Sequence, residues 1–210
     1  MAKRTGEKYN AIIEAAVKVI AENGYHNSQV SKIAREAGVA DGTIYLYFQN
    51  KEDVLVSLFK VKMGDFTASA RQELKQLENP YERLAKLISM HFMMLEADRN
   101  LALVLQIQLR QSDAFIRKGI AAPLKDYFKI VEEIIEQGIS TGVFRSDLNK
   151  KLTRQIVFGA MDEVATSWVM SQHNYKLTDQ IEPVYNLLAR AMSTDGACQA
   201  FPAKLLNKAG

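Results

Sequence analysis

The chain has 210 residues, 48% of them hydrophobic and 24% charged, which suits one large or two modest globular domains. Its one cysteine, Cys198, excludes an intrachain disulfide framework, and the charged first residues lack the apolar run of a signal peptide. No apolar stretch approaches the ~18 residues of a membrane span, so we expect a cytoplasmic protein with no membrane partner.

Apolar residues recur at helical spacing along nearly the whole chain, and only four prolines interrupt them. This pattern predicts an all-α fold of about nine helices. The expected helices lie at about 7–23, 29–37, 42–47, 51–77, 81–95 and 99–111, then one through 140 with Pro123 near its N-terminal end, and finally 149–172 and 177–193.

Short polar residues and turn formers mark the expected helix ends. The residues expected to cap or open helices are Ser28, Asp41, Ser112 or Asp113, Asn149 and Thr178. Gly38 stands between two short helices, at a position where a positive φ is expected and glycine adopts it without strain. Asn79-Pro80 ends the long helix that begins near Lys51.

The stretch 28–55 reads SQVSKIAREAGVADGTIYLYFQNKEDVL, which predicts two short helices around a glycine turn and then the start of a third. A motif of this shape puts a helix into the major groove of DNA. Charge alone does not indicate nucleic-acid binding, because positive and negative side chains nearly balance up to Lys60. Contacts with DNA must therefore come from a basic N-terminal arm, helix N-termini, hydroxyl groups and a few well-placed cations.

These residues resemble the TetR family of bacterial transcriptional regulators. The match keeps its spacing into the fourth expected helix and includes Val30, Ile33-Ala34, Ala37-Gly38-Val39, Gly42-Thr43, Tyr45, Tyr47-Phe48, Asn50-Lys51 and Leu55. The resemblance implies a homodimer in which a three-helix DNA-binding head at 1–50 is joined to a helical ligand-binding and dimerisation body at 51–194. We expect residues 195–210 to form a loose tail.

The resemblance also implies which residues contact double-stranded operator DNA. Gly42 and Thr43 lie at the tip of the recognition helix, where small side chains let the backbone approach base edges and Thr43 can meet a thymine methyl group. The expected phosphate or groove contacts are Ser28, Gln29, Arg35, Tyr45, Tyr47 and Lys51, with Lys3 and Arg4 reaching the backbone or the adjacent minor groove. The alternative is that Tyr45 and Tyr47 are surface aromatics and that Arg35 belongs to a solvated face.

Three body segments, 101–104, 108–112 and 158–163, look like those of TetR-type regulators of fatty-acid degradation from Gram-positive bacilli. This similarity implies a repressor that long-chain acyl-CoA releases from DNA. An acyl chain needs a long apolar tunnel, and methionines adapt well to variable chains. The expected lining is Met63, Phe66, Met90, Phe92, Met93, Met94, Leu95, Leu105, Phe128 and Met161. The alternative is that these side chains are ordinary core residues.

The phosphates of CoA need hydrogen-bond donors and cations at the mouth of such a tunnel. The expected residues are Arg110, Gln111, Arg117 and Lys118. For Arg110 the alternative is an internal salt bridge with Asp162 or Glu163.

The dimer seam is expected on the last two long helices by analogy with the family. The expected seam residues are Ala160, Val164, Ser167, Trp168, Leu188 and Met192. The sequence does not separate this role from an interior one for Trp168.

No motif for catalysis or metal binding appears: there is no HExxH, CxxC, GxSxG, P-loop or dinucleotide glycine pattern. His91, on the apolar face of its helix, is expected to be a core histidine rather than a metal ligand. We therefore expect no catalytic residue, no metal, no enzyme activity, and no bound cofactor other than the effector.

Two rival functions stay open. The first is a TetR-type repressor that responds to another apolar or cationic effector, such as a drug, in which case Asp162 and Glu163 would face the ligand. The second is a helical acyl-CoA-binding enzyme or carrier, which would leave the stretch 28–55 unexplained.

Overall fold

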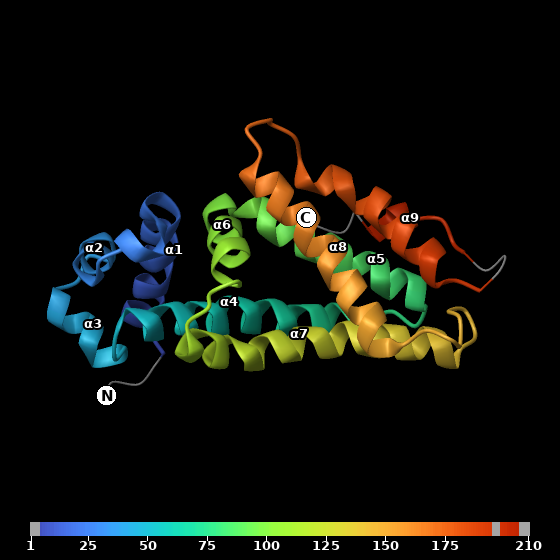
Figure 1. Cartoon of the computed structure of the whole chain (residues 1–210), viewed down its shortest axis with the longest axis horizontal. Helices are drawn as coiled ribbons and strands as arrows, with labels where there is room; N and C mark the ends of the chain where they lie inside the picture. Colours follow the sequence, from blue (N-terminus) through green and yellow to red (C-terminus); the bar gives the residue numbers. More distant parts are fainter. Residues whose placement is uncertain (1–4, 195–197, 206–210) are drawn as a thin grey trace. The chain divides into compact units, whose positions relative to one another are not determined.

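The computed structural model describes residues 5–194 and 198–205, and these residues form an all-α structure (Figure 1). The prediction of an all-α fold is confirmed: nine α-helices and two short 3-10 helices appear in the described ranges, with no strand and one isolated antiparallel bridge between Phe144 and Ser193. The helices are α1 Glu7–Asn27, α2 Val30–Glu36, α3 Asp41–Tyr47, α4 Lys51–Leu74, α5 Pro80–Ala97, α6 Arg99–Gln108, α7 Ala114–Ser140, α8 Lys150–Met170 and α9 Ile181–Met192. Within the same ranges, none of the helices is both long and apolar enough to cross a lipid bilayer.

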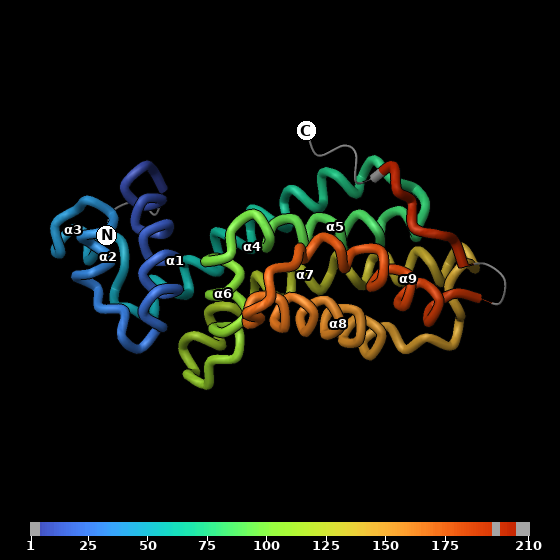
Figure 2. The backbone as a smooth tube through the Cα atoms, turned by 90° about the horizontal axis from the view of Figure 1, so that it is seen from above, coloured from blue at the N-terminus to red at the C-terminus, as the bar shows by residue number. Residues whose placement is uncertain are grey.

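The chain forms two compact units. The first unit is Met1–Gly64 with Arg99–Leu124, and the second is Asp65–Asp98 with Lys125–Gly210. The first unit is larger than the expected head of 1–50 because α6 packs against α1 (Figure 2) and because the first turns of α4 are buried. Helices α4 and α7 each contribute residues to both units.

Two of the expected helix caps in the first unit are wrong. The N-cap of α2 is Gln29 rather than Ser28, and the N-cap of α3 is Ala40 rather than Asp41; neither cap makes a side-chain hydrogen bond. The Ser28 hydroxyl is buried and bonds instead to the carbonyl oxygen of Gly24 at 2.7 Å. The buried hydroxyl is thus held against α1, and α2 begins one residue later than the sequence suggested.

Other local predictions are confirmed. Gly38 has φ 65 and turns the chain between α2 and α3. Asn149 caps α8 by accepting from the Leu152 backbone N–H at 3.0 Å, and Asp113 accepts from Ile116 at 2.9 Å at the start of α7. Asn79 was expected only to end the preceding helix, but its side chain also caps α5, where Pro80 is the first helical residue.

Helix α7 corrects the expected position of Pro123. The helix begins at Ala114, so Pro123 lies inside it rather than near its N-terminal end. Proline removes one backbone hydrogen bond and crowds the preceding turn, and a helix of 27 residues can absorb that loss when its apolar face is buried. Thr178 does not open the last helix as expected: it is the second residue of the 3-10 helix Leu177–Gln180, and α9 begins at Ile181. Its backbone N–H and hydroxyl donate to the Glu96 carboxylate.

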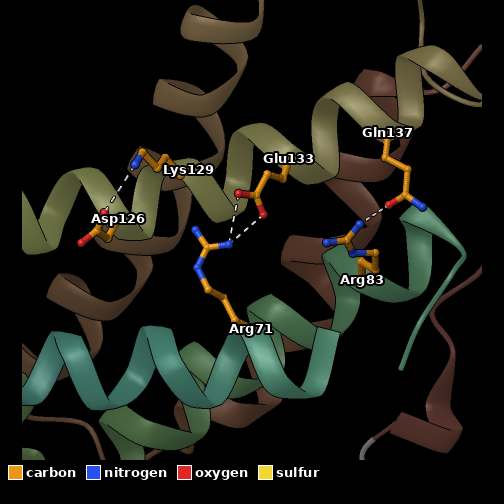
Figure 3. Close-up of polar contacts among 6 residues, drawn as sticks. All are labelled: Arg71, Arg83, Asp126, Lys129, Glu133 and Gln137. Carbon is orange, nitrogen blue, oxygen red and sulfur yellow. Dashed lines mark hydrogen bonds and ion pairs between the residues drawn. The ribbon is translucent and has the colours of Figure 1, made fainter. Parts of the chain in front are cut away.

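Polar side chains link α4, α5 and α7 in the second unit (Figure 3). Arg71 of α4 donates to both carboxylate oxygens of Glu133 on α7, at 3.1 and 3.0 Å. Arg83 of α5 donates to the Gln137 side chain of α7, and Gln137 donates to the Glu78 carbonyl oxygen at 2.7 Å. Exposed ion pairs contribute little free energy, so the buried apolar faces of these helices carry most of the stability.

The described part of the C-terminal segment is packed rather than loose, which corrects the expectation for 195–210. The Phe201 ring is buried and lies edge-on to the Tyr185 ring, with centroids 5.4 Å apart. The Tyr185 hydroxyl donates to the Gln199 carbonyl oxygen at 3.1 Å, and Lys204 pairs with Glu82 at 2.6 Å. Residues 195–197 and 206–210 lie outside the described residues.

Candidate DNA-binding head and ligand-binding body

Helix α3 has one buried and one exposed face. Ile44 and, just after the helix, Phe48 are fully buried and hold the helix in the head. On the opposite face Gly42 is exposed, and Tyr45 keeps 56% of its surface accessible. Leu46 is also 56% exposed, which the sequence reasoning did not single out. The exposed face of α3 thus offers a small tip, a phenol and an unexpected apolar side chain.

Gly42 is not required by the fold. A Cβ atom at this position would meet no heavy atom within 4 Å, and the backbone does not have a positive φ. Neither packing nor backbone conformation demands glycine here, so the tip of α3 is open to close approach by a partner.

Several cations of the head have partners within it. Lys18 pairs with Glu36 at 2.6 Å, and Lys32 donates to the Asn23 side chain at 2.9 Å. Lys51 donates to the carbonyl oxygens of Tyr25 and His26, at 3.0 and 3.1 Å, and lies 4.5 Å from the centre of the Tyr25 ring.

The remaining expected DNA contacts differ in their accessibility. Gln29 and Arg35 are exposed, whereas Thr43 and Tyr47 are half-buried and Tyr47 contacts the Tyr9 ring. The Ser28 hydroxyl is buried and bonded inside the head, so it does not face a phosphate. Lys3 and Arg4 lie outside the described residues.

Two side-chain-to-backbone hydrogen bonds cap the N-terminus of α4. The Asn50 side chain accepts from the Asp53 backbone N–H at 2.8 Å, and the buried Asp53 carboxylate accepts from the Gln49 N–H at 2.9 Å. The Tyr25 hydroxyl donates to Glu52 at 3.2 Å, and burial with the nearby Glu52 charge raises the pKa of Tyr25. The head is therefore firmly joined to α4.

The residues expected to line an acyl tunnel are divided between the two units. The first unit holds Met63, Leu105, Arg110, Gln111, Arg117 and Lys118, and the second holds Phe66, Met90, Phe92, Met93, Met94, Leu95, Phe128 and Met161. Phe66, Phe92, Leu95, Leu105 and Met161 are buried, as both a tunnel and an ordinary core would require. Arg110 donates to the backbone carbonyl oxygen of Gln106 at 2.7 Å. The tunnel stays a prediction.

An aromatic cluster with one histidine fills part of the second unit. His91 of α5 lies edge-on to the Phe66 ring, with centroids 6.0 Å apart, and the Tyr127 hydroxyl is 3.4 Å from His91 Nδ1. Burial lowers the pKa of His91 to about 4. Burial, with a smaller effect of the Asp162 charge, raises the pKa of Tyr127. The sequence indicated a core histidine, but helical spacing alone does not reveal the tyrosine partner.

Phe128 is half-buried beside this cluster. The Arg154 guanidinium lies 4.2 Å from the centre of its ring, and the Phe158 ring stands edge-on at 5.0 Å. Arg154 also pairs with Glu132 at 3.2 Å. A ligand that contacts Phe128 therefore meets a ring whose face is already engaged by a cation.

Three of the expected dimer residues are interior in the protomer. Trp168, Leu188 and Met192 are buried, and the Trp168 indole donates to the Tyr175 carbonyl oxygen at 2.9 Å. Ala160 and Val164 are half-buried, and exposed Ser167 donates to Glu163. The exposed apolar side chains on these two helices are Leu152, Ile156, Met170 and Leu187. The seam on these two helices stays a prediction, and its large exposed apolar side chains are not the residues that the sequence singled out.

Comparison with known proteins resolves the class of the protein. The family described as "Bacterial regulatory proteins, tetR family" matches residues 12–58, and the one described as "YsiA-like protein, C-terminal region" matches residues 59–191. The chain belongs to the TetR family. It is thus a helix-turn-helix transcriptional regulator, with α2 and α3 as the DNA-binding motif.

The sequence similarity to individual regulators extends over both units of the chain. The fatty acid metabolism regulator protein of Bacillus subtilis (strain 168) is 50% identical over 186 residues, which are 89% of this chain and 96% of that relative. The solved structure of the fatty acid degradation regulator FadR from Bacillus halodurans matches with a TM-score of 0.82 at 50% identity and covers 86% of this chain and 97% of that one. The solved structure of FadR from Bacillus subtilis in complex with stearoyl-CoA matches with a TM-score of 0.83 at 51% identity, and it covers the same shares of the two chains.

Replacement of Gly42 by alanine separates DNA affinity from folding. Because a methyl group at this position meets no atom of the protein, and because alanine is the better helix former, we expect Gly42→Ala to leave the thermal midpoint unchanged or raise it slightly. The same methyl group would keep the backbone away from the base edges and weaken operator binding about tenfold or more. Thermal melting and band-shift assays on one preparation measure both effects. Undiminished operator affinity would remove the argument for close approach at α3.

The buried His91 should make stability depend on pH. Its pKa is about 4 when folded and about 6.5 when unfolded, so the unfolded state binds the extra proton between these values and stability falls as pH falls from 6.5 to 4. From pH 7 to pH 5 we expect the wild type to lose about 2 kcal/mol more unfolding free energy than His91→Phe. Urea denaturation at the two pH values measures this difference. His173→Gln, which alters an exposed histidine, is the matched control and should keep the wild-type slope.

Proposed function

We propose that this protein is a repressor of fatty-acid degradation genes, that it binds operator DNA as a homodimer, and that long-chain acyl-CoA releases it from that DNA. It carries out this role in the bacterial cytoplasm, and it is not an enzyme. The head supplies the DNA contacts through the exposed face of α3, and the helical body supplies the effector site.

The likeness of the body to FadR is the observation that carries this proposal. Head sequences of TetR regulators are similar whatever their ligand, so the head alone indicates little about the effector. Here the identity is 50% over 89% of the chain, which includes the body, and a relative at 51% identity was solved with stearoyl-CoA. A body this similar supports an effector of the same chemical class.

In the proposed mechanism, the effector changes the relative populations of two conformations of the dimer, of which only one fits the operator. In the DNA-bound state the two recognition helices of a dimer must lie about one turn of DNA apart, ~34–36 Å. An inducer must bind a state with a different spacing more tightly, by ~1–3 kcal/mol or more. Helix α4 begins in the unit that contains α3 and continues into the other unit, so it is one covalent route by which the state of the body can reach the head.

A cationic effector remains the second candidate because one carboxylate is buried in the body. Asp162 of α8 is only 8% exposed, whereas Glu163 next to it is exposed. A buried acid is suited to a positively charged drug. An enzyme or carrier is the weaker rival, because it gives no role to α2 and α3.

A band-shift titration tests the effector. Stearoyl-CoA at micromolar concentration should release the operator fragment, whereas CoA alone, which lacks the acyl chain, should leave the complex intact. Cationic drugs should have no effect. Release by a cationic drug with no response to stearoyl-CoA would favour the second candidate, and turnover of acyl-CoA without operator binding would favour an enzyme.

For the dimer we propose a seam on the exposed apolar face of α8 and α9, centred on Ile156 and Leu187. Leu187 is 73% exposed, although it lies in the strongly amphipathic helix α9. A charge buried at this seam would oppose association, so we expect Leu187→Glu to yield monomers and abolish operator binding. Light scattering after gel filtration measures the mass. Phe115→Glu, at an exposed ring of α7, is the control and should remain dimeric.

A further inference from the structure

His91 and Tyr127 form a polar pair among aromatic rings in the second unit. His91 is 8% exposed, and Tyr127 is fully enclosed. The Phe66 ring of α4 and the Phe158 ring of α8 flank the pair, with Phe66 6.0 Å from the His91 ring and Phe158 5.7 Å from the Tyr127 ring. Four helices of the body therefore surround one hydrogen-bonded pair.

The second ring nitrogen of His91 has no partner. Nε2 is one of three buried side-chain nitrogen or oxygen atoms that lack a hydrogen bond in the described part of the chain. The other two belong to the guanidinium groups of Arg83 and Arg154, which already face Gln137 and Glu132. Native proteins pair nearly all buried polar atoms, because leaving one unpaired is costly. The unpaired Nε2 atom of His91 therefore indicates a position where a bound molecule can supply the missing hydrogen bond.

The tautomer of His91 decides what the occupant must be. Burial keeps the imidazole neutral, so one nitrogen is a donor and the other is an acceptor. If the Tyr127 hydroxyl donates to Nδ1, only the Nε2–H group remains unpaired. If Nδ1 donates instead, both the tyrosine proton and the Nε2 lone pair remain unpaired. The first arrangement satisfies more groups, so Nε2 carries the proton and seeks an acceptor.

A neutral carbonyl oxygen is the acceptor that suits these surroundings. The neighbouring rings are apolar, and the negative charge near Tyr127 comes from Asp162. A carboxylate or phosphate would therefore be repelled and would pay a large desolvation penalty. The polar group closest to the chain of an acyl-CoA is its uncharged thioester carbonyl, and everything beyond it along the chain is apolar.

We propose that the Nε2–H group of His91 donates a hydrogen bond to the thioester carbonyl oxygen of the bound acyl-CoA. His91 thereby distinguishes a thioester from a free fatty acid or an alkane of equal length. This inference rests on the acyl-CoA response proposed above, and it adds the residue that recognises the acyl head.

The test compares two ligands on the full-length protein by titration calorimetry. One is stearoyl-CoA, and the other is S-octadecyl-CoA, a thioether in which a methylene group replaces the carbonyl. We expect the wild type to bind the thioester about tenfold more tightly, the effect of one buried hydrogen bond. His91→Leu should bind both ligands equally, whereas His91→Gln, whose amide nitrogen can replace Nε2, should keep the preference. His173→Gln should behave as the wild type.

The outcomes separate this inference from the proposed function. Equal affinity of the wild type for the two ligands, with operator release by both, would overturn the role of His91 and leave the acyl-CoA response standing; water would then be the partner of Nε2. A preference that survives in folded His91→Leu would overturn it as well. If neither ligand binds, the acyl-CoA response itself fails. The wild-type comparison needs no variant, so it stands even if His91→Leu does not fold.

Discussion

The joint between the C-terminal end of α1 and the first turn of α4 holds the DNA-binding head together. Lys51 donates to two carbonyl oxygens near the end of α1, where helical carbonyls lack their usual intrahelical partners, and Glu52 accepts from the Tyr25 hydroxyl. Helices α2 and α3 lie in the chain between these two ends. Fastening the ends therefore closes α2 and α3 over a small core of Ile33, Ile44 and Phe48 and fixes which face of α3 stays exposed.

The head binds internally several cations that a basic DNA-binding surface would otherwise present. Lys51, Lys18 and Lys32 all have partners inside the head, in a region where positive and negative charges nearly balance. Nonspecific attraction to DNA scales with the number of phosphates that cations neutralise. Recognition by this head must then depend more on close approach and hydrogen bonds from α3 than on charge, which agrees with an open tip at Gly42.

The sequence predicted what depends on local pattern and not what depends on tertiary partners. Nine helices, the Asn149 cap and the turn at Gly38 follow from periodicity and backbone preference alone. Ser28 failed as a cap because its hydroxyl is buried against the carbonyl oxygens of Gly24 and Val19 in α1, and Val19 is nine residues away. The sequence left Trp168 open between an interior role and the dimer seam, and only the packed body shows that its side chain is buried. The orphan nitrogen of His91 is visible only once its neighbours are placed.

The aromatic neighbours of His91 also lie on the two helices shared by the units, so the proposed thioester site is linked to both helices. Helix α4 passes from one unit to the other at Gly64, two residues before Phe66, and α7 passes just after Pro123, one turn before Tyr127. Glycine weakens a helix, and proline removes one of its hydrogen bonds, so both helices bend most easily at these points. A ligand seated against His91 would contact Phe66 and Tyr127, the rings that follow those weak points. In the proposed mechanism, small shifts of these rings would bend α4 and α7 at these points without unfolding either helix.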